Sequence, residues 1–222
     1  MTQKTRINMF FFDVHTHFPG PQKNIISIVN EYPKDVSSNQ HFSVGIHPRF
    51  ISQEELEKEF QFLQKKINLK NCLAIGECGL DKLATTEYKT QLSVFKQHIE
   101  ISEKHNKPLI IHCVRAYNDI INLKKMFNPK QPWIIHGFNK NHQIANDLIK
   151  NNIFLSFGNA LSLNKKLQQI VKEIDSSKIL LESDSSKKSI IDIYNTFASI
   201  KKQNINSVIE QINKNFNKIF TL

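Results

Sequence analysis

Short apolar runs rich in Ile, Phe and Val recur along the whole chain, and longer segments with helical period separate most of them. The runs are continuous rather than alternating, which is typical of strands covered on both faces in a parallel sheet. Eight strands are predicted, at Phe10–His15, Ile25–Val29, Phe42–His47, Leu73–Cys78, Leu109–Cys113, Trp133–Gly137, Ile153–Phe157 and Ile179–Asp184. Helices are predicted at Gln53–Lys66, Glu87–His105, Tyr117–Phe127, Gln143–Lys150, Ser189–Lys202 and Ile205–Phe220.

This order of elements favours one fold class. Consecutive parallel strands need crossover connections, so strands that alternate with helices predict a (β/α)8 TIM barrel. A doubly wound open sheet has the same local pattern and stays the alternative. No linker, repeat or low-complexity tract divides the 222 residues, so a compact single domain over 1–222 is expected. The strand at Ile25–Val29 follows the first one too closely for a full helix between them.

The charge of the chain leaves two interpretations open. There are 30 Lys and Arg against 20 Asp and Glu, a formal net charge of +10. Such a balance favours a nucleic-acid partner, because cationic side chains release counterions from phosphates. The excess is lysine, however, scattered singly and in pairs, and arginine occurs only at Arg6, Arg49 and Arg115. A dispersed, solvated surface accounts for this pattern equally well.

Cysteine usage and hydropathy indicate a cytoplasmic protein without membrane contact. The apolar run Met9-Phe10-Phe11-Phe12 is shorter than the ~7–15 residues of a signal-peptide core, and no stretch reaches the ~18 apolar residues of a membrane span. Cys72, Cys78 and Cys113 form no CxxC pair. This argues against a disulfide framework or a thiolate zinc site.

Polar residues gather where the predicted strands end. Five of the nine histidines fall at or just past these C-terminal ends, namely His15, His17, His47, His112 and His136. Glu77 and Asp184 do likewise. In a parallel α/β fold, ligands and reactions collect at the carboxyl ends of the strands. Imidazole nitrogens and carboxylate oxygens are together the ligand set for Zn, Mn, Fe or Ni.

Each of these residues could have an ordinary structural role when taken alone. The pair His15 and His17 leaves one face of a strand, because side chains there repeat with period two, yet such a pair is common without a metal. Glu77 could cap a helix, and a lone histidine could be buried and hydrogen-bonded. The joint pattern predicts a metal site made by His15, His17, Glu77, His112, His136 and Asp184. The other histidines, His41, His98, His105 and His142, are interpreted as surface or packing residues.

Six motifs in order resemble the TatD family of metal-dependent deoxyribonucleases. They are Phe11-Phe12-Asp13-Val14-His15-Thr16-His17, Gly45-Ile46-His47-Pro48, Gly76-Glu77-Cys78-Gly79-Leu80-Asp81, Ile111-His112-Cys113, His136-Gly137-Phe138 and Glu182-Ser183-Asp184. The resemblance extends from about Phe11 to Leu222. It implies a TIM barrel of the amidohydrolase superfamily, with two divalent metal ions (Zn, Mg or Mn) as cofactors and DNA as substrate. No obligate protein partner is implied.

The resemblance also implies a role for each site residue. His15 and His17 would bind the first ion, Glu77 would bridge both, and His112 and His136 would hold the second. Asp184 would ligate the first ion and orient the attacking water, which makes Asp184 and Glu77 the catalytic pair. His47 and Glu182 would orient substrate or metal ligands.

Two departures from the family pattern concern substrate binding. The family has an arginine two residues after the histidine of the fifth strand, whereas here Val114 takes that place and Arg115 comes one later. Arg115 is the candidate phosphate contact. The family also has a Pro-rich, Arg-containing loop of ~20–30 residues after the last motif, in the length range of functional loops. This chain has only Ser185-Ser186-Lys187-Lys188 before the next predicted helix.

Three functions therefore stay open. The first is a metal-dependent nuclease acting on DNA or RNA. The second keeps the same centre but hydrolyses a small phosphoester, amide or ester, as the short loop suggests. The third is a nucleic-acid-binding descendant without turnover, which the complete ligand set disfavours.

Overall fold

The computed structural model describes residues 10–18, 23–37 and 40–222. Residues 1–9, which include Met9 of the apolar run compared with a signal-peptide core, lie outside these ranges. Eight parallel strands form one sheet in the order β1 to β8. The strands are β1 (Phe11–Thr16), β2 (Ile25–Glu31), β3 (Phe42–Val44), β4 (Cys72–Asp81), β5 (Leu109–Val114), β6 (Trp133–Ile135), β7 (Ile153–Phe157) and β8 (Ile179–Leu181).

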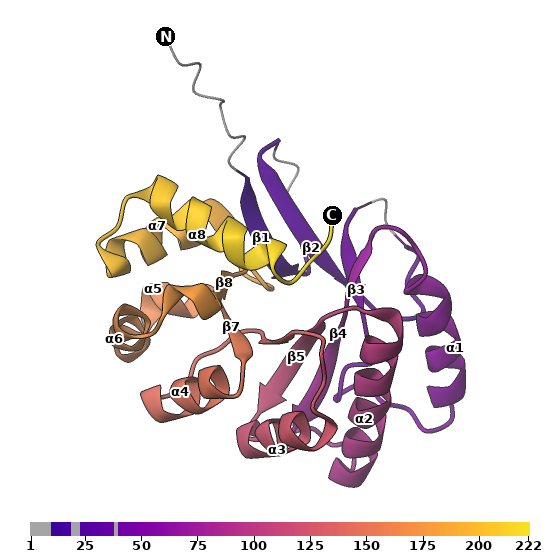
Figure 1. The fold of residues 1–222 in the computed structure, drawn as a ribbon. Helices are drawn as coiled ribbons and strands as arrows, with labels where there is room; N and C mark the ends of the chain where they lie inside the picture. The colour runs from indigo at the N-terminus through magenta and orange to yellow at the C-terminus, as the bar shows by residue number, and fades with distance from the viewer. Residues whose placement is uncertain (1–9, 19–22, 38–39) are drawn as a thin grey trace.

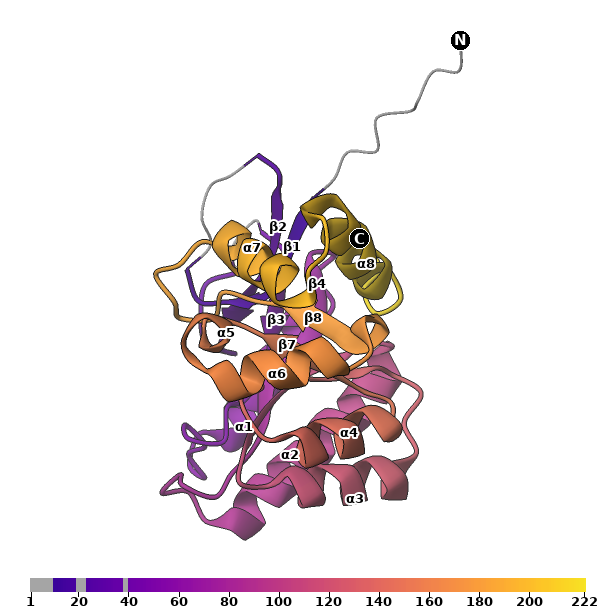
Figure 2. The same cartoon turned by 90° about the vertical axis from the view of Figure 1, so that its left-hand side faces the viewer.

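Helices surround the strands, as Figures 1 and 2 show from two sides. They are α1 (Leu56–Lys66), α2 (Tyr88–His105), α3 (Tyr117–Phe127), α4 (His142–Lys150), α5 (Ala160–Leu163), α6 (Lys165–Glu173), α7 (Ile190–Lys201) and α8 (Ile205–Asn217), with a 3-10 turn at Ser176–Lys178. The described residues between β1 and β2, and between β2 and β3, contain no helix. None of the helices in the described ranges has the length and apolar character needed to span a membrane.

The sheet closes into a barrel through the segment that follows β8. Thr16 at the end of β1 forms a parallel bridge with Asp184. The Asp184 N–H donates to His15 O at 2.9 Å, and the His17 N–H donates to Asp184 O at 3.1 Å. Ser183 adds two hydrogen bonds to the buried carboxylate of Asp13, at 2.9 Å from its N–H and 2.6 Å from its hydroxyl. The predicted (β/α)8 barrel is confirmed, and the open sheet is excluded.

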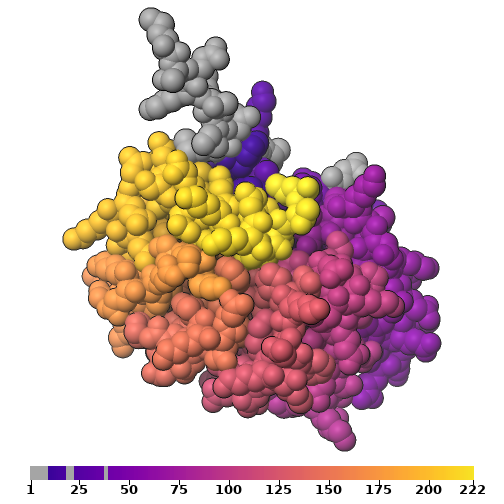
Figure 3. Space-filling model, in the orientation of Figure 1, coloured from indigo at the N-terminus to yellow at the C-terminus, as the bar shows by residue number. Residues whose placement is uncertain are grey.

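Two layers of apolar side chains stabilise the barrel. One layer packs between the strands and the helices around Trp133, Phe42 and Phe95. The other fills the barrel interior and includes Phe12, Val14, Ile28, Leu73, Ala74, Ile110, Ile134, Phe154, Leu180, Phe216, Ile219 and Phe220. Phe12 and Leu73 stand near the starts of their strands, so α8 and the residues after it cover the N-terminal end of the barrel. In Figure 3 the yellow C-terminal residues accordingly lie against both the orange and the magenta parts of the chain.

Several predicted boundaries are wrong in an informative way. Strands β3, β6 and β8 end at Val44, Ile135 and Leu181, two or three residues earlier than predicted. The polar residues beyond these ends lie at the barrel mouth, where Asp184 pairs with Thr16. Strand β4 continues to Asp81 instead of ending at Cys78. Helix α6, which buries Leu167, Ile170 and Val171 at helical spacing, was not among the predicted helices.

Candidate metal centre

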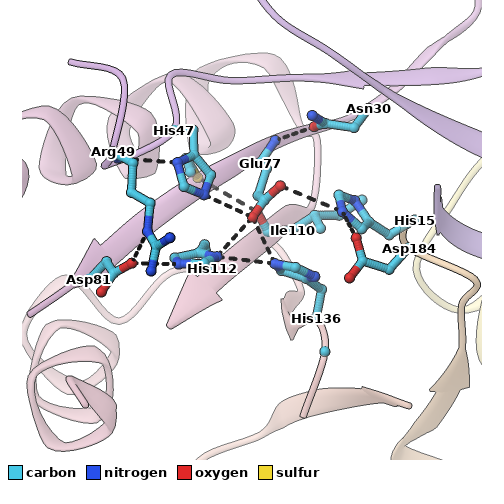
Figure 4. A network of polar contacts seen from close by, with 12 residues as sticks. His15, Asn30, His47, Arg49, Glu77, Asp81, Ile110, His112, His136 and Asp184 are labelled. Carbon is cyan, nitrogen blue, oxygen red and sulfur yellow. Dashed lines mark hydrogen bonds and ion pairs between the residues drawn. The ribbon is translucent and has the colours of Figure 1, made fainter. Parts of the chain in front are cut away.

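One carboxylate oxygen of Glu77 faces three imidazoles (Figure 4). Glu77 comes from β4, where its backbone N–H donates to Asn30 Oδ1 on β2 at 2.9 Å. Its Oε1 lies 2.8 Å from His112 Nδ1 and 2.8 Å from His136 Nε2. His47 Nε2 is 3.1 Å from the same oxygen. The side chains of His47 after β3, His112 within β5 and His136 after β6 therefore converge on one atom.

The other oxygen of Glu77 faces a second group of donors. Oε2 lies 3.5 Å from His15 Nε2 and 3.8 Å from His17 Nε2. Asp184 Oδ1 lies 3.7 Å from His15 Nε2 and 3.6 Å from His17 Nε2. Glu77 thus stands between two groups of nitrogen and oxygen atoms, which is the position that a bridging carboxylate needs.

His112 lies between two carboxylates. Its Nε2 is 3.2 Å from Asp81 Oδ2, and its Nδ1 is 2.8 Å from Glu77 Oε1 and 3.4 Å from His136 Nε2. A neutral imidazole carries one N–H, so when Asp81 holds that hydrogen on Nε2, the lone pair of Nδ1 is directed at Glu77 and His136. In that tautomer the three side chains fit a cation held by Glu77, His112 and His136.

His47 has the opposite arrangement. Its Nδ1 accepts a hydrogen bond from the Arg49 N–H at 3.1 Å, so its Nε2 carries the hydrogen that points to Glu77 Oε1. His47 therefore donates to the carboxylate and does not offer it a free lone pair. This suits the orienting role that the resemblance implies for His47.

The pKa values of the cluster show a site that attracts positive charge. Burial alone would raise the pKa of Glu77, but the neighbouring imidazoles of His136, His112 and His47 hold it well below its usual range. Burial alone would lower the pKa of His136, but the carboxylates of Glu77 and Glu182 hold it well above its usual range. The anionic Glu77 thus keeps a proton on a neighbouring ring, and a metal ion can take the place of that proton.

His15 supplies an independent test of whether these residues fit a metal. The side chain is fully buried, and neither ring nitrogen has a hydrogen-bond partner among the described residues. Burial lowers the pKa of His15 to about 3, so the ring is neutral and offers a lone pair. Ligand atoms lie within 4.8 Å of one another in the sets His15–His17–Glu77 and His15–His136–Asp184; in a third set, His47–Glu77–His112, His47 donates to Glu77 instead of offering a lone pair. The residues present fit a divalent metal centre.

Asp184 is positioned by the contacts that close the barrel. Its backbone has a φ of 50°, in the left-handed region that residues other than glycine rarely adopt. The bonds from Asp184 N–H to His15 and from His17 N–H to Asp184 hold it there. The carboxylate remains 39% exposed, so it faces both the cluster and solvent. Burial, followed by the charge of Glu182, raises its pKa.

Glycines at positions 45 and 79 allow the chain to approach its neighbouring strands closely beside the cluster. A Cβ atom at Gly79, whose φ is +139°, would collide with the backbone oxygen of His112. A Cβ at Gly45 would lie 2.7 Å from the backbone oxygen of Glu77. Glycine at these two positions lets the neighbouring strands bring their ligands together.

The structure brings most of the predicted site residues together. All six predicted ligands lie in the cluster, together with His47, and Glu182 lies beside it with Oε1 3.6 Å from His136 Nδ1. Arg115 lies just past β5, exposed, with a φ of 56°. In the described part of the chain no hydrogen bond or ion pair joins Arg115 to the cluster. Four further residues hold the ligands or their loops in place, and the pattern of histidines did not predict this role for them: Asn30, Arg49, Asp81 and His98.

Asp81 orients His112 and provides a testable prediction. Its Oδ2 accepts from Arg49 Nε at 2.5 Å as well as from His112 Nε2. Replacing Asp81 by Asn is expected to weaken Mn²⁺ binding by about 10- to 100-fold, the usual effect of losing a partner that orients a metal ligand. Isothermal titration with Mn²⁺ measures this. Asp119→Asn is the matched control, because Asp119 pairs with Lys82 and Tyr88 but contacts no imidazole; equal losses in both variants would contradict the role of Asp81.

His98 anchors the loop that carries His47. It is fully buried, with Nδ1 2.8 Å from Val94 O and Nε2 accepting from the Ile46 N–H at 3.0 Å. Of the two roles predicted for this histidine, surface or packing, the structure shows the second. Burial lowers its pKa to about 4.

The low pKa of His98 predicts a loss of stability in acid. Between about pH 6.5 and 4 the unfolded chain binds a proton at this residue that the folded chain does not, so the free energy of unfolding falls as pH falls. The full contribution is about 3 kcal/mol. His98→Gln keeps an acceptor for the Ile46 N–H. In denaturant unfolding without metal, the free energy of unfolding of this variant should fall by about 3 kcal/mol less than that of the unmodified chain as the pH is lowered from about 6.5 to 4. His142→Gln, at an exposed histidine, should behave as the unmodified chain; an identical acid profile for His98→Gln would contradict this prediction.

The chain is similar to known hydrolases and nucleases. The family model described as TatD related DNase matches residues 8–221. A relative from Buchnera aphidicola subsp. Baizongia pistaciae, named an uncharacterized metal-dependent hydrolase, is 31% identical over 83% of this chain and 75% of its own length. The human protein named 3'-5' RNA nuclease TATDN2 is 28% identical over 64% of this chain, which spans only 19% of that protein.

The fold has a counterpart among solved structures. The TatD homologue YjjV from Escherichia coli K12 superimposes with a TM-score of 0.82 at 15% identity, covering 97% of this chain and 100% of that one. At this identity the likeness concerns the fold alone. The family match, by contrast, covers nearly all of the chain and includes every residue of the cluster. The chain belongs to the TatD family of metal-dependent hydrolases.

Proposed function

We propose that this protein is a nuclease that hydrolyses DNA phosphodiester bonds with two divalent metal ions. The observation that carries the proposal is the position of Glu77, whose Oε1 faces His112 and His136 while its Oε2 faces His15 and His17. The description of the family as DNases, the nuclease name of the human relative and the net charge of +10 support a nucleic-acid substrate.

The side chains of the cluster have separate parts in this reaction. Divalent ions held by His15, His17, Glu77 and Asp184 and by Glu77, His112 and His136 would lower the pKa of a bound water toward neutral and neutralise charge on the phosphate. Asp184, partly exposed and with a raised pKa, accepts a proton from the attacking water as its oxygen bonds to phosphorus. The bond from phosphorus to the leaving oxygen breaks, and that oxygen takes up a proton from solvent, to which Asp184 returns the proton it accepted. His47 orients Glu77, and Arg115 is the proposed phosphate contact.

A second candidate is the hydrolysis of a small phosphoester, amide or ester. The observation that favours it is the short connection after Asp184, because α7 begins at Ile190 with Ser189 as its N-cap. Only residues 185–189 separate the site from this helix, which leaves little chain to cover a long nucleic-acid strand.

A substrate panel separates these functions. Purified protein with Mn²⁺, Mg²⁺ or Zn²⁺ is assayed on DNA and RNA oligonucleotides and on small phosphoesters, esters and amides, with a chelator as control. The proposal predicts metal-dependent release of nucleotides that disappears when His15 and His17 are both replaced by Ala. Much faster turnover of a small substrate would establish the second candidate. Stoichiometric metal binding and oligonucleotide binding without turnover would indicate a non-catalytic protein.

A further inference from the structure

A small pocket adjoins the metal centre and shares one wall with it. It has a volume of about 230 Å³ and is lined by Tyr32, Pro33, His47 and Phe50, with Lys34 and Glu59 among its other residues. His47 is the shared wall, because its Nε2 lies 3.1 Å from Glu77 Oε1. A group bound at the metal centre therefore has this pocket as its immediate neighbour.

The pocket is lined mainly by ring side chains. Phe50 is 59% exposed although it is a large apolar residue. Its ring centroid lies 5.1 Å from that of His47, with 37° between the planes, and 5.6 Å from that of Tyr32, in an edge-to-face arrangement of 76°. An exposed phenyl ring held in this way has a face available for stacking with a flat group.

Buried hydrogen bonds hold the pocket in place. The backbone oxygen of Tyr32 accepts from Lys66 Nζ at 3.0 Å, and Lys66 is buried in an ion pair with Glu31 at 2.8 Å. On the opposite wall, His98 accepts from the Ile46 N–H, as described above. The Phe50 N–H donates to His47 O at 2.9 Å. Buried side chains thus fix the backbone of both walls of the pocket. The rings therefore do not need to rearrange to receive a ligand.

The size and chemistry of the pocket favour one occupant. Sites for drug-sized ligands occupy about 300–1,000 Å³, so this pocket has room for a single flat ring system and not for a whole nucleotide. The pocket lies beside a centre that would bind a phosphodiester. A flat ring in the pocket would therefore belong to the same substrate, joined to that phosphate through a sugar. We propose that the pocket receives a nucleobase next to the scissile phosphate, stacked on Phe50 and bordered by Tyr32. This inference rests on the proposed nuclease function and makes Phe50 and Tyr32 substrate-binding residues.

Matched dinucleotides test the contribution of stacking. One carries 2-aminopurine, and the other carries a tetrahydrofuran in place of that base beside the same phosphodiester. Phe50→Ala should lower the ratio of kcat/KM for the base-bearing to the abasic dinucleotide by about 5- to 150-fold, as alanine substitution of a stacking aromatic does. Phe50→Trp should restore the ratio, whereas Phe50→Leu, which is apolar but has no ring, should not. Phe62→Ala, at an exposed phenylalanine of α1 outside the pocket, should leave the ratio unchanged.

A binding measurement keeps this inference separate from the proposed function. Quenching of 2-aminopurine fluorescence reports stacking without any hydrolysis. Quenching by the unmodified protein that is lost in Phe50→Ala supports the base pocket even if neither dinucleotide is cleaved, a result that would refute only the nuclease function. Absence of quenching, or an equal effect of Phe50→Ala on the two dinucleotides, would overturn the base pocket even if oligonucleotides are cleaved.

Discussion

Glu77→Gln should reduce the metal-dependent activity of this protein by more than about 100-fold. Losing a residue that only orients a metal ligand already costs about 10- to 100-fold, and Glu77 itself faces five imidazoles. Gln preserves the size of the side chain but removes the negative charge that attracts cations to the cluster. It also presents an amide NH₂ where one carboxylate oxygen faced imidazole nitrogens. Steady-state kinetics on the best substrate of the panel, at saturating Mn²⁺, measures the loss.

The matched control for this variant is Glu100→Gln, at an exposed position of α2. It removes the same charge from the chain without touching the cluster, so its activity should equal that of the unmodified protein. Circular dichroism of both variants shows whether the barrel still folds. Activity of folded Glu77→Gln within a few-fold of the unmodified protein would mean that Glu77 is not a metal ligand.

Phe216→Ala should lower the free energy of unfolding by about 3–5 kcal/mol. Phe216 is fully buried, and its ring stacks on that of Phe12 with centroids 3.8 Å apart and 16° between the planes. The centroid of the Phe220 ring lies 4.5 Å from that of Phe216. Removing the Phe216 ring leaves a cavity where α8 covers the N-terminal end of the strands, and rigid strands on one side limit how far it can collapse. Denaturant unfolding at neutral pH measures this loss.

Because this substitution lies at the end of the barrel opposite the metal centre, it separates stability from chemistry. Folded Phe216→Ala should bind Mn²⁺ with the affinity of the unmodified protein. Phe62→Ala truncates a phenylalanine that is 42% exposed and should cost far less stability. If the two variants lose equal stability, α8 does not stabilise the barrel in the way described.

The sequence allowed the barrel to be predicted because its strands are buried on both faces. Continuous apolar runs such as Ile153–Phe157, when helices follow them, are typical of the parallel strands of an α/β fold. The ends of the strands were less predictable. Strands β6 and β8 end at Ile135 and Leu181, but single backbone hydrogen bonds continue beyond them, from the His136 N–H to Ile111 O and from the Glu182 N–H to Phe157 O, so the apolar and polar pattern alone did not mark the ends. Closure of the barrel depends on Thr16 and Asp184, which are 168 residues apart and have no local signal that pairs them.

The candidate metal ligands were predictable because several histidines and acidic residues gather at the ends of strands, which is unusual. The residues that hold these ligands in place could not be predicted in this way. Asn30 and His98 reach Glu77 and Ile46 across 47 and 52 residues of sequence. Asp81 did leave a signal. Glu77, Gly79 and Asp81 alternate along β4, so a strand continued to Asp81 would have placed this acid on the same face as Glu77. Ending the predicted strand at Cys78 hid that relation.

The proposed function requires this cluster to hydrolyse phosphodiesters with two metal ions. Titration of metal-stripped protein with Mn²⁺, with nucleotide release from a DNA oligonucleotide as the signal, tests it most directly. We expect no release without metal and a rate that rises to a plateau at two ions per chain. Release at an undiminished rate from metal-free protein, or no release at any Mn²⁺ concentration while the ions bind, would contradict it.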